Sequence, residues 1–164
     1  MTTPVAIRPE TQGDRVAIHD CVRAAFGRPE EADLVARLRR DGDLVLSLVA
    51  EDAGAVLGQA TFSRLFVENG RATALAPVGV TPARRGQGVG GALIREGLRL
   101  LAERGEDVVL VLGDPQYYGR FGFTAEAAQA LKTPYDGPYQ QALALGGRSL
   151  AGAVRYPAAF ADLT

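Results

Sequence analysis

Short runs of apolar and β-branched residues, separated by turn residues, dominate the middle of the chain. They cover residues 44–51, 55–68 and 72–80. Asp52-Ala53-Gly54 separates the first two runs. Asn69-Gly70, among the strongest hairpin signals, separates the last two. The pattern therefore predicts an antiparallel meander of three strands.

The region before the meander has a helical period, with apolar residues three and four positions apart. Residues 5–8 look like a short strand, and Thr11 is a candidate N-cap for a helix through about Phe26. A second helix is expected to begin after Pro29 and to run to about Arg40. The two helices are expected to bury Ile18, Val22, Ala25 and Phe26 in the first and Leu34, Val35 and Leu38 in the second, with His19 and Asp20 outside the buried stripe.

The helical period returns after the meander over residues 88–104 and ends at Gly105. An unbroken apolar run follows at 108–112, typical of a strand buried on both faces. Strand, helix and strand from 74 to 112 therefore predict a βαβ unit with two parallel strands. Farther along the chain we expect a short helix or turn within residues 114–123 and two weaker strands within 139–145 and 151–156.

Length and composition narrow the class of protein. A chain of 164 residues with 47% hydrophobic and 23% charged residues fits one globular domain over residues 1–164. The formal net charge of −1 and the absence of a basic stripe argue against a nucleic-acid partner. Cys21 is the single cysteine, no metal-ligand spacing occurs, and no apolar run approaches the roughly 20 residues of a membrane span. We therefore expect no metal, no membrane contact and a reducing cytoplasm.

A glycine-rich segment, "RRGQGVGG" at residues 84–91, lies between the third strand of the meander and the next helix. Gly86, Gly88 and Gly91 fit the dinucleotide-binding pattern GxGxxG, with Asp114 as a candidate ribose-binding acid. Five residues separate the strand from Gly86, however, and only one βαβ unit is present. These two features weigh against a dinucleotide site.

The order of elements resembles the GNAT N-acetyltransferase superfamily. Its phosphate loop has the form (Gln/Arg)-x-x-Gly-x-(Gly/Ala), matched by Arg85, Gly88 and Gly90. The family often carries a Tyr four residues before a Gly-Phe pair, as Tyr118 stands before Gly122. The stretches "LGDPQYYGRFGF" and "VRYPAAF" are similar to a subgroup of small uncharacterised bacterial members. The resemblance implies an α+β fold, with a mixed, mostly antiparallel twisted sheet and a central parallel βαβ unit for acetyl-CoA, flanked by helices.

Acetyl-CoA is the cosubstrate that the resemblance implies. Backbone amides of the glycine loop, at a helix N-terminus, form a cradle suited to the pyrophosphate. Pro77 and Gly79 are both poor residues for a regular interior strand, so we expect either a bulge there or a place where sheet pairing stops. In the family this strand binds the pantetheine arm. The cofactor-binding residues implied are Val78, Gly79, Val80, Arg85, Gly86, Gln87, Gly88, Val89, Gly90 and Gly91.

Acetyl transfer requires a neutral amine, a donor to the developing oxyanion and a proton for the departing thiolate. Tyr118 is the expected general acid, and its neighbour Tyr117 is the alternative. The strand before the loop contains no acid or His, so the base stays open. The candidates are Glu68, Asp114, Glu30, Glu31, a water chain, or an amine that is already neutral.

Two other functions remain at this stage. One is a GNAT-fold module that binds CoA without catalysis, and the other is an NAD(P)-dependent oxidoreductase. The acceptor amine is unidentified. By resemblance, residues of about 19–40 and 134–160 shape its site, and a homodimer is compatible with the fold.

Overall fold

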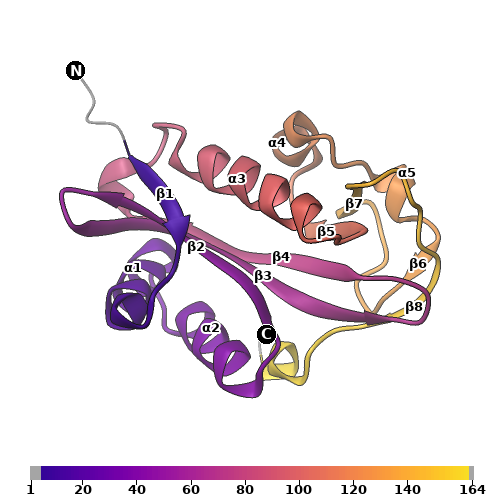
Figure 1. Cartoon of the computed structure of the whole chain (residues 1–164), viewed down its shortest axis with the longest axis horizontal. Coiled ribbons are helices and arrows are strands. Elements are labelled where there is room, and N and C mark those ends of the chain that lie inside the picture. Colours follow the sequence, from indigo (N-terminus) through magenta and orange to yellow (C-terminus); the bar gives the residue numbers. More distant parts are fainter. Residues whose placement is uncertain (1–4, 163–164) are drawn as a thin grey trace.

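The structure is a computed structural model that describes residues 5–162. One twisted sheet runs through the molecule, with helices on both of its faces (Figure 1). The strands are hydrogen-bonded in the order β1-β2-β3-β4-β5-β7. The strand bounds are β1 Ala6–Pro9, β2 Leu44–Asp52, β3 Ala55–Val67, β4 Ala72–Val80, β5 Val108–Leu112, β6 Leu131–Lys132, β7 Gln140–Ala144 and β8 Gly152–Arg155.

The antiparallel meander is confirmed. β2, β3 and β4 pair antiparallel in sequence order, and β1 adds an antiparallel edge beside β2. β4 and β5 run parallel, joined by the crossover helix α3 (Val89–Glu103), as the βαβ prediction required. β7 pairs antiparallel with β5, and β8 pairs with the end of β3. The main sheet is therefore mixed and mostly antiparallel, in agreement with the expected fold class.

Two helices cover one face of the sheet on its β1–β4 side: α1 (Arg15–Phe26) and α2 (Glu30–Asp41). A 3₁₀ turn, η1 (Gln12–Asp14), precedes α1, so the α-helix begins four residues after Thr11. The prediction that Phe26 is buried is wrong, because its side chain is 40% exposed. The helical period places Phe26 about 80° around the axis from Ile18, which turns it toward the edge of the buried stripe.

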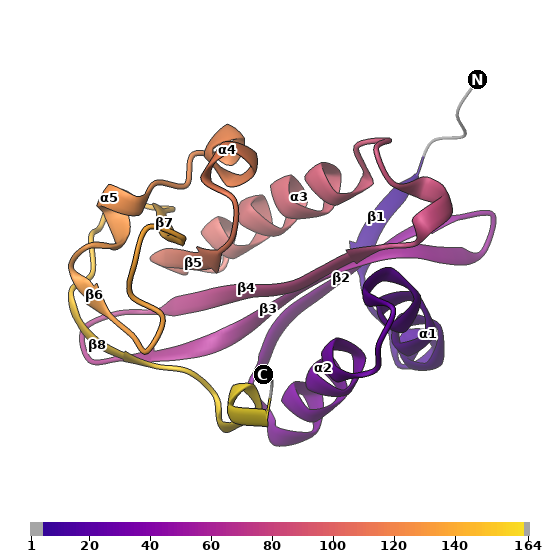
Figure 2. The ribbon, with the colours of Figure 1, turned by 180° about the vertical axis from the view of Figure 1, so that it is seen from behind.

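Helix α3 covers the opposite face and packs through Leu93, Ile94 and Leu101 on the main core cluster, which includes Leu48 and Phe62. The chain after β5 forms short helical segments on the same side. The C-terminal segment returns to the first face, where its last turn lies beside α2 (Figure 2). The remaining helical segments are η2 Pro82–Arg84, α4 Pro115–Tyr118, η3 Gly119–Phe121, α5 Ala125–Ala128 and η4 Ala158–Asp162.

Candidate functional site

Strands β4 and β5 part after a short parallel stretch. Their pairing covers only Ala72–Ala74 and Val108–Leu110. β4 continues to Val80 on β3 alone, and within residues 5–162 no strand pairs with its other edge beyond Ala74. The β3–β4 register shifts around Ala76-Pro77, whose peptide bond is cis. The irregularity expected at Pro77 is confirmed as this register shift, whereas pairing with β5 ends earlier, at Ala74, and Gly79 stays paired with Gln59 of β3.

Residues in the part of β4 that pairs with β3 alone face the two sides of the sheet alternately. Val78 and Val80 pack against the core beneath α3. Gly79 lies under the end of α1, where a Cβ atom would stand 3.0 Å from the Cβ of Ala25 and 3.4 Å from the ring of Phe26. The absence of a side chain at Gly79 therefore lets α1 approach β4 closely.

The glycine loop runs from η2 into the first turn of α3. Gly86 and Gly88 have φ angles of +75° and +81°, in the left-handed region that side chains disfavour. Gly88 is the N-cap of α3, so the first N–H groups of the helix are directed out of its end. The loop thus combines free amides with the positive end of a helix dipole, which favours an anion.

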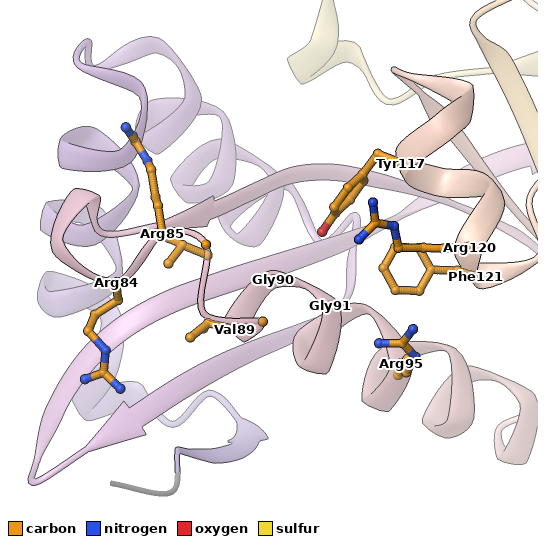
Figure 3. A pocket seen from close by; sticks show the side chains of 12 residues that line it. Arg84, Arg85, Val89, Gly90, Gly91, Arg95, Tyr117, Arg120 and Phe121 are labelled. Atoms are coloured by element: carbon orange, nitrogen blue, oxygen red, sulfur yellow. The ribbon is translucent and has the colours of Figure 1, made fainter. Parts of the chain in front are cut away.

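A pocket of about 360 Å³ opens at this helix end (Figure 3). Four arginines contribute to its wall and no carboxylate does. Seven of the predicted cofactor residues line it, whereas Val78, Gly79 and Gln87 do not. The lining residues are Val80, Arg84, Arg85, Gly86, Gly88, Val89, Gly90, Gly91, Arg95, Tyr117, Arg120 and Phe121.

Two of the arginines are held by groups outside the pocket. Arg84 donates to Asp52 at 3.0 Å and to the side-chain oxygen of Gln87 at 2.9 Å. Arg85 donates to the carbonyl of Ala25 near the end of α1. Figure 3 shows both side chains directed away from Gly90 and Gly91. These contacts fix the loop on β2 and α1.

Adjacent tyrosines on α4 have different surroundings. Tyr117 lies over the loop, with its hydroxyl 3.3 Å from the position that a Cβ atom at Gly90 would occupy. The ring of Tyr118 covers Gly113 and packs edge to face on Phe123, with ring centroids 6.0 Å apart. Burial, and to a smaller extent the neighbouring Tyr117, raise the pKa of Tyr118. Tyr118 is therefore protonated at neutral pH.

None of the candidate bases lines the pocket. Glu31 is buried and accepts from Arg28 at 2.9 Å, and Glu30 lies 3.8 Å from the same guanidinium. Asp114 caps α4 by accepting from the N–H of Gln116 at 2.9 Å. Glu68 follows β3 at the end of the β3–β4 hairpin, opposite to the glycine loop.

Three pocket residues were missed by sequence reasoning: Arg95, Arg120 and Phe121. Arg95 stands four positions after Gly91, one helical turn along the same face of α3, and this spacing was an available signal. Arg120 and Phe121 lie inside the quoted "YYGRFGF" stretch, but only the fold of η3 brings them to the pocket.

The described part of the chain contains no group of three or more His, Cys, Asp or Glu residues that could hold a metal ion. Over the same residues, no helix combines the length and the apolar character needed to cross a bilayer.

A pocket suited to a phosphate-type anion thus lies at a helix N-terminus, beside a parallel strand pair that parts, which is the arrangement that the resemblance to the GNAT superfamily implied. Comparison with known proteins tests that resemblance. The sequence profile of the acetyltransferase (GNAT) domain matches residues 6–125. The chain belongs to the GNAT acetyltransferase family, and this replaces the alternative interpretation as a dinucleotide-binding oxidoreductase.

Individual relatives agree with this assignment. An uncharacterised N-acetyltransferase of Escherichia coli K12, YhbS, is 41% identical over 134 residues, which cover 80% of each protein. The crystal structure of E. coli YhbS in complex with CoA has a TM-score of 0.90, at 35% identity and with 100% and 97% coverage. A Brucella melitensis GNAT acetyltransferase in complex with acetyl-CoA has a TM-score of 0.82 at 41% identity, with 96% and 98% coverage.

Proposed function

We propose that this protein transfers the acetyl group of acetyl-CoA to a primary amine of a small molecule or peptide. The observation that carries the proposal is the arginine-lined glycine pocket, placed next to the point where β4 leaves β5. Similarity to the E. coli and B. melitensis proteins crystallised with CoA and acetyl-CoA supports the choice of donor.

In this proposal the CoA pyrophosphate binds the backbone amides of the glycine loop. The pantetheine arm then extends along the free edge of β4 at Val78, Gly79 and Val80, where the backbone groups that face away from β3 have no strand partner. The side chain of Tyr117 covers the loop at Gly90. The pyrophosphate-binding residues are Arg85, Gly86, Gln87, Gly88, Val89, Gly90 and Gly91, as the sequence predicted.

The reaction is a direct attack of the amine nitrogen on the thioester carbonyl. The C–N bond forms, the C–S bond breaks, and the thiolate of CoA leaves. A backbone N–H between Val78 and Val80 stabilises the oxyanion. The amine attacks in its neutral form, and its nitrogen then loses one proton to water as the amide forms.

Tyr118 donates a hydrogen bond to the departing sulfur. With a reference pKa of about 10 against about 8.5 for a thiol, complete proton transfer from Tyr118 costs roughly 2 kcal/mol. Burial raises the pKa of Tyr118 and increases that cost. We therefore assign Tyr118 as the general acid that hydrogen-bonds the sulfur while the C–S bond breaks.

Further parts of the proposal concern the whole chain. Residues 1–164 act as one acetyltransferase domain in the cytoplasm, and neither a nucleic acid nor a membrane is a partner. The fold is compatible with a homodimer, which sedimentation of the purified chain tests directly.

The deciding experiment combines thiol release with calorimetry. Acetyl-CoA is titrated into the protein, and CoA release is then followed with a panel of primary amines, small molecules and peptides. Binding of acetyl-CoA with amine-dependent release of the thiol is the expected result. Binding without turnover on any amine would favour the non-catalytic CoA-binding module instead.

A further inference from the structure

Strand β7 begins with two adjacent glutamines, Gln140 and Gln141, which are only 3% and 0% exposed. A glutamine amide is costly to bury unless its donors and its acceptor find partners. The amide nitrogen of Gln140 donates to the carbonyl of Leu131 at 3.2 Å and to Asp136 at 3.3 Å, and its oxygen accepts from the hydroxyl of Thr133. Gln140 therefore ties β7 to β6 and to the loop that follows β6.

The amide of Gln141 is directed instead toward the end of β5. Its Nε2 atom donates to the carbonyl of Gly113 at 3.0 Å and to the carbonyl of Tyr139 at 3.3 Å. The β5–β7 ladder ends at the pair Leu112 and Gln140, so Gly113 lies one residue beyond the ladder. The side chain of Gln141 thus supplies the donor for a carbonyl that the strand pairing leaves behind.

The other half of this amide has no partner. Atom Oε1 of Gln141 is buried and accepts no hydrogen bond from any residue of the described range 5–162. An unpaired buried acceptor destabilises a fold, and a leucine of similar size would avoid that cost. Stability alone therefore does not explain a glutamine at this position. What a glutamine provides and a leucine cannot is the hydrogen bond to Gly113.

Gly113 is the surface on which the ring of Tyr118 rests. A Cβ atom at Gly113 would stand 2.5 Å from Cε2 and 3.1 Å from Cδ2 of that ring. The ring therefore lies directly against the backbone at residue 113, and the placement of this peptide sets the placement of the ring. Gln141 is the cross-strand neighbour of Val111, which packs in the same core cluster as Tyr118. Gln141 and Tyr118 thus lie on the same side of the sheet, with Gly113 between them.

We propose that Gln141 is a positioning residue for acetyl transfer, which holds the Tyr118 hydroxyl at the departing sulfur by fixing the peptide of Gly113. This inference rests on the proposed function, in which Tyr118 donates a hydrogen bond to that sulfur. The effect of a catalytic donor depends steeply on its position, since a displacement of about 1 Å can cost on the order of 100-fold in rate. Without the Gln141 amide, the peptide beneath the ring loses its anchor and the hydroxyl moves with it.

The test is a double-mutant cycle on kcat with Gln141→Leu and Tyr118→Phe. Thiol release is followed with acetyl-CoA and the primary amine of the panel that gives the fastest release with the wild-type protein. Gln141→Leu should lower kcat by on the order of 10-fold in the wild-type background. In the Tyr118→Phe background it should lower kcat less than about twofold, because the hydroxyl that it positions is already absent. Affinity for CoA, measured by calorimetry, should change less than about twofold in Gln141→Leu, since Gln141 does not line the glycine pocket.

Gln140→Leu is the matched control. It removes a buried glutamine from the adjacent position of β7, but the hydrogen bonds of Gln140 go to Leu131, Thr133 and Asp136 rather than to Gly113. Any effect of Gln140→Leu on kcat should therefore be the same factor with and without the Tyr118 hydroxyl.

Fluorine NMR of protein labelled with fluorotyrosine gives a second measurement that needs no amine. The Tyr118 resonance is identified by its loss in Tyr118→Phe. It should shift or broaden in Gln141→Leu and keep its position in Gln140→Leu. The same spectra show that the variants are folded, as we expect for Gln141→Leu, because leucine removes the unpaired Oε1 acceptor.

Each contrary outcome has a separate meaning. Equal fractional losses of kcat for Gln141→Leu in both backgrounds would overturn the inference, because Gln141 would then act independently of the Tyr118 hydroxyl. An unchanged kcat, or a Tyr118 resonance that does not move, would overturn it as well. A wild-type protein that releases no thiol with any amine would contradict the proposed function instead. The fluorine spectra would then still decide whether Gln141 holds the ring of Tyr118.

Discussion

Tyr117 and Tyr118 follow one another in the sequence, and their ring centroids are 5.0 Å apart. Tyr117 faces the glycine loop, whereas Tyr118 is packed over Gly113 at the end of β5. Because β5 ends beside the point where β4 departs, Tyr118 lies on the side of the proposed thioester. The two hydroxyl groups should therefore have separable effects on binding and turnover.

Removal of the Tyr118 hydroxyl tests its role as the acid. We expect Tyr118→Phe to lower kcat by about 10² or more, the usual effect of a positioned acid, with CoA affinity changed less than about twofold. Tyr117→Phe should instead weaken CoA binding. Steady-state kinetics and calorimetry on both variants measure this difference. Equal turnover of Tyr118→Phe and the wild-type protein at every pH would remove Tyr118 from the mechanism.

The raised pKa of Tyr118 gives a prediction for the alkaline side of the pH profile. The protonated phenol is the active form, and a higher pKa keeps it protonated to higher pH. We expect no loss of kcat from Tyr118 ionisation below about pH 10, its reference pKa. A pH series of kcat with a saturating amine measures it. An alkaline decrease near pH 8 that disappears in Tyr118→Phe would contradict a raised pKa.

Gly90 tests the pocket itself. A Cβ atom at Gly90 would stand 3.3 Å from the hydroxyl of Tyr117, so a larger side chain enters the space proposed for the phosphates. We expect Gly90→Trp to weaken acetyl-CoA binding by at least about 100-fold, since it removes several charge-assisted hydrogen bonds. Ala92→Trp is the control. Ala92 lies two residues after Gly90 in α3, is exposed and does not line the pocket. Unchanged affinity in folded Gly90→Trp would refute the loop assignment.

At the scale of elements, the close packing of α3 on the sheet depends on one glycine. A Cβ atom at Gly97 would stand 2.3 Å from the ring of Phe62 on β3. The ring fills the space that any side chain would need, so the helix and strand approach closely there. Because α3 begins in the glycine loop, this contact also positions the pocket.

In Gly97→Ala, helix propensity and core packing change the free energy of unfolding in opposite directions. Propensity alone favours alanine by about 1 kcal/mol, whereas overpacking a core usually costs about 1–3 kcal/mol. We expect a net decrease in the free energy of unfolding in Gly97→Ala, measured by urea denaturation. Addition of Phe62→Leu should recover part of the loss, because the smaller side chain makes room for the methyl group. A stabilised Gly97→Ala single variant would show that propensity outweighs the contact.

The elements themselves were largely predictable, because hydrophobic period and turn residues are local signals. Asn69-Gly70 indicated the hairpin, and Pro77 with Gly79 indicated the register irregularity between β3 and β4. Phe26 was misplaced, since the period of α1 says which residues share a stripe but not where the sheet beneath it ends. Arg95 and Arg120 were missed for a related reason. Both line the same pocket because η3 folds back over α3, and these segments are 25 residues apart in the sequence.

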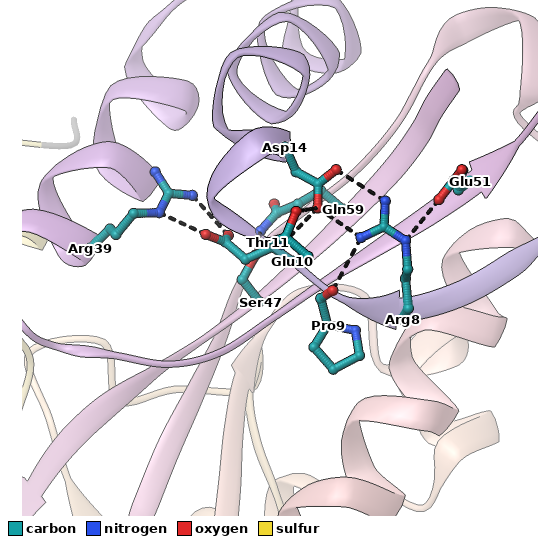
Figure 4. Close-up of polar contacts among 9 residues, drawn as sticks. All are labelled: Arg8, Pro9, Glu10, Thr11, Asp14, Arg39, Ser47, Glu51 and Gln59. Carbon is teal, nitrogen blue, oxygen red and sulfur yellow. Dashed lines mark hydrogen bonds and ion pairs between the residues drawn. The ribbon is translucent and has the colours of Figure 1, made fainter. Parts of the chain in front are cut away.

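At the scale of the whole molecule, a network of charged groups fastens the N-terminal strand (Figure 4). Arg8 on β1 donates to Asp14 at 2.7 and 3.0 Å and to Glu51 on β2 at 2.7 Å. Arg39 on α2 donates to Glu10 at 2.8 Å. β1 is an edge strand of four residues, so these ion pairs join it to α1, α2 and β2 more firmly than its ladder alone would.

Asp14 is the centre of that network and makes stability depend on pH. Hydrogen bonds from Arg8 and from the N–H of Thr11 lower the pKa of Asp14 below that of an unfolded Asp, about 3.9. Its contribution is therefore complete above pH 5 and decreases as pH falls below about 4. We expect Asp14→Asn to reduce the free energy of unfolding by about 1–3 kcal/mol at pH 7, the range for hydrogen bonds to charged groups.

Urea denaturation at several pH values measures the difference between the wild-type protein and Asp14→Asn. That difference should be constant from pH 7 to pH 5 and shrink below pH 4, because acid protonates the carboxylate that the variant lacks. Asp33→Asn is the control, since the Asp33 side chain is 68% exposed and its pair with His19 should contribute under about 1 kcal/mol. A difference that persists undiminished below pH 3 would mean that Asn at this position disturbs packing rather than charge. In that case the network would not account for the attachment of β1.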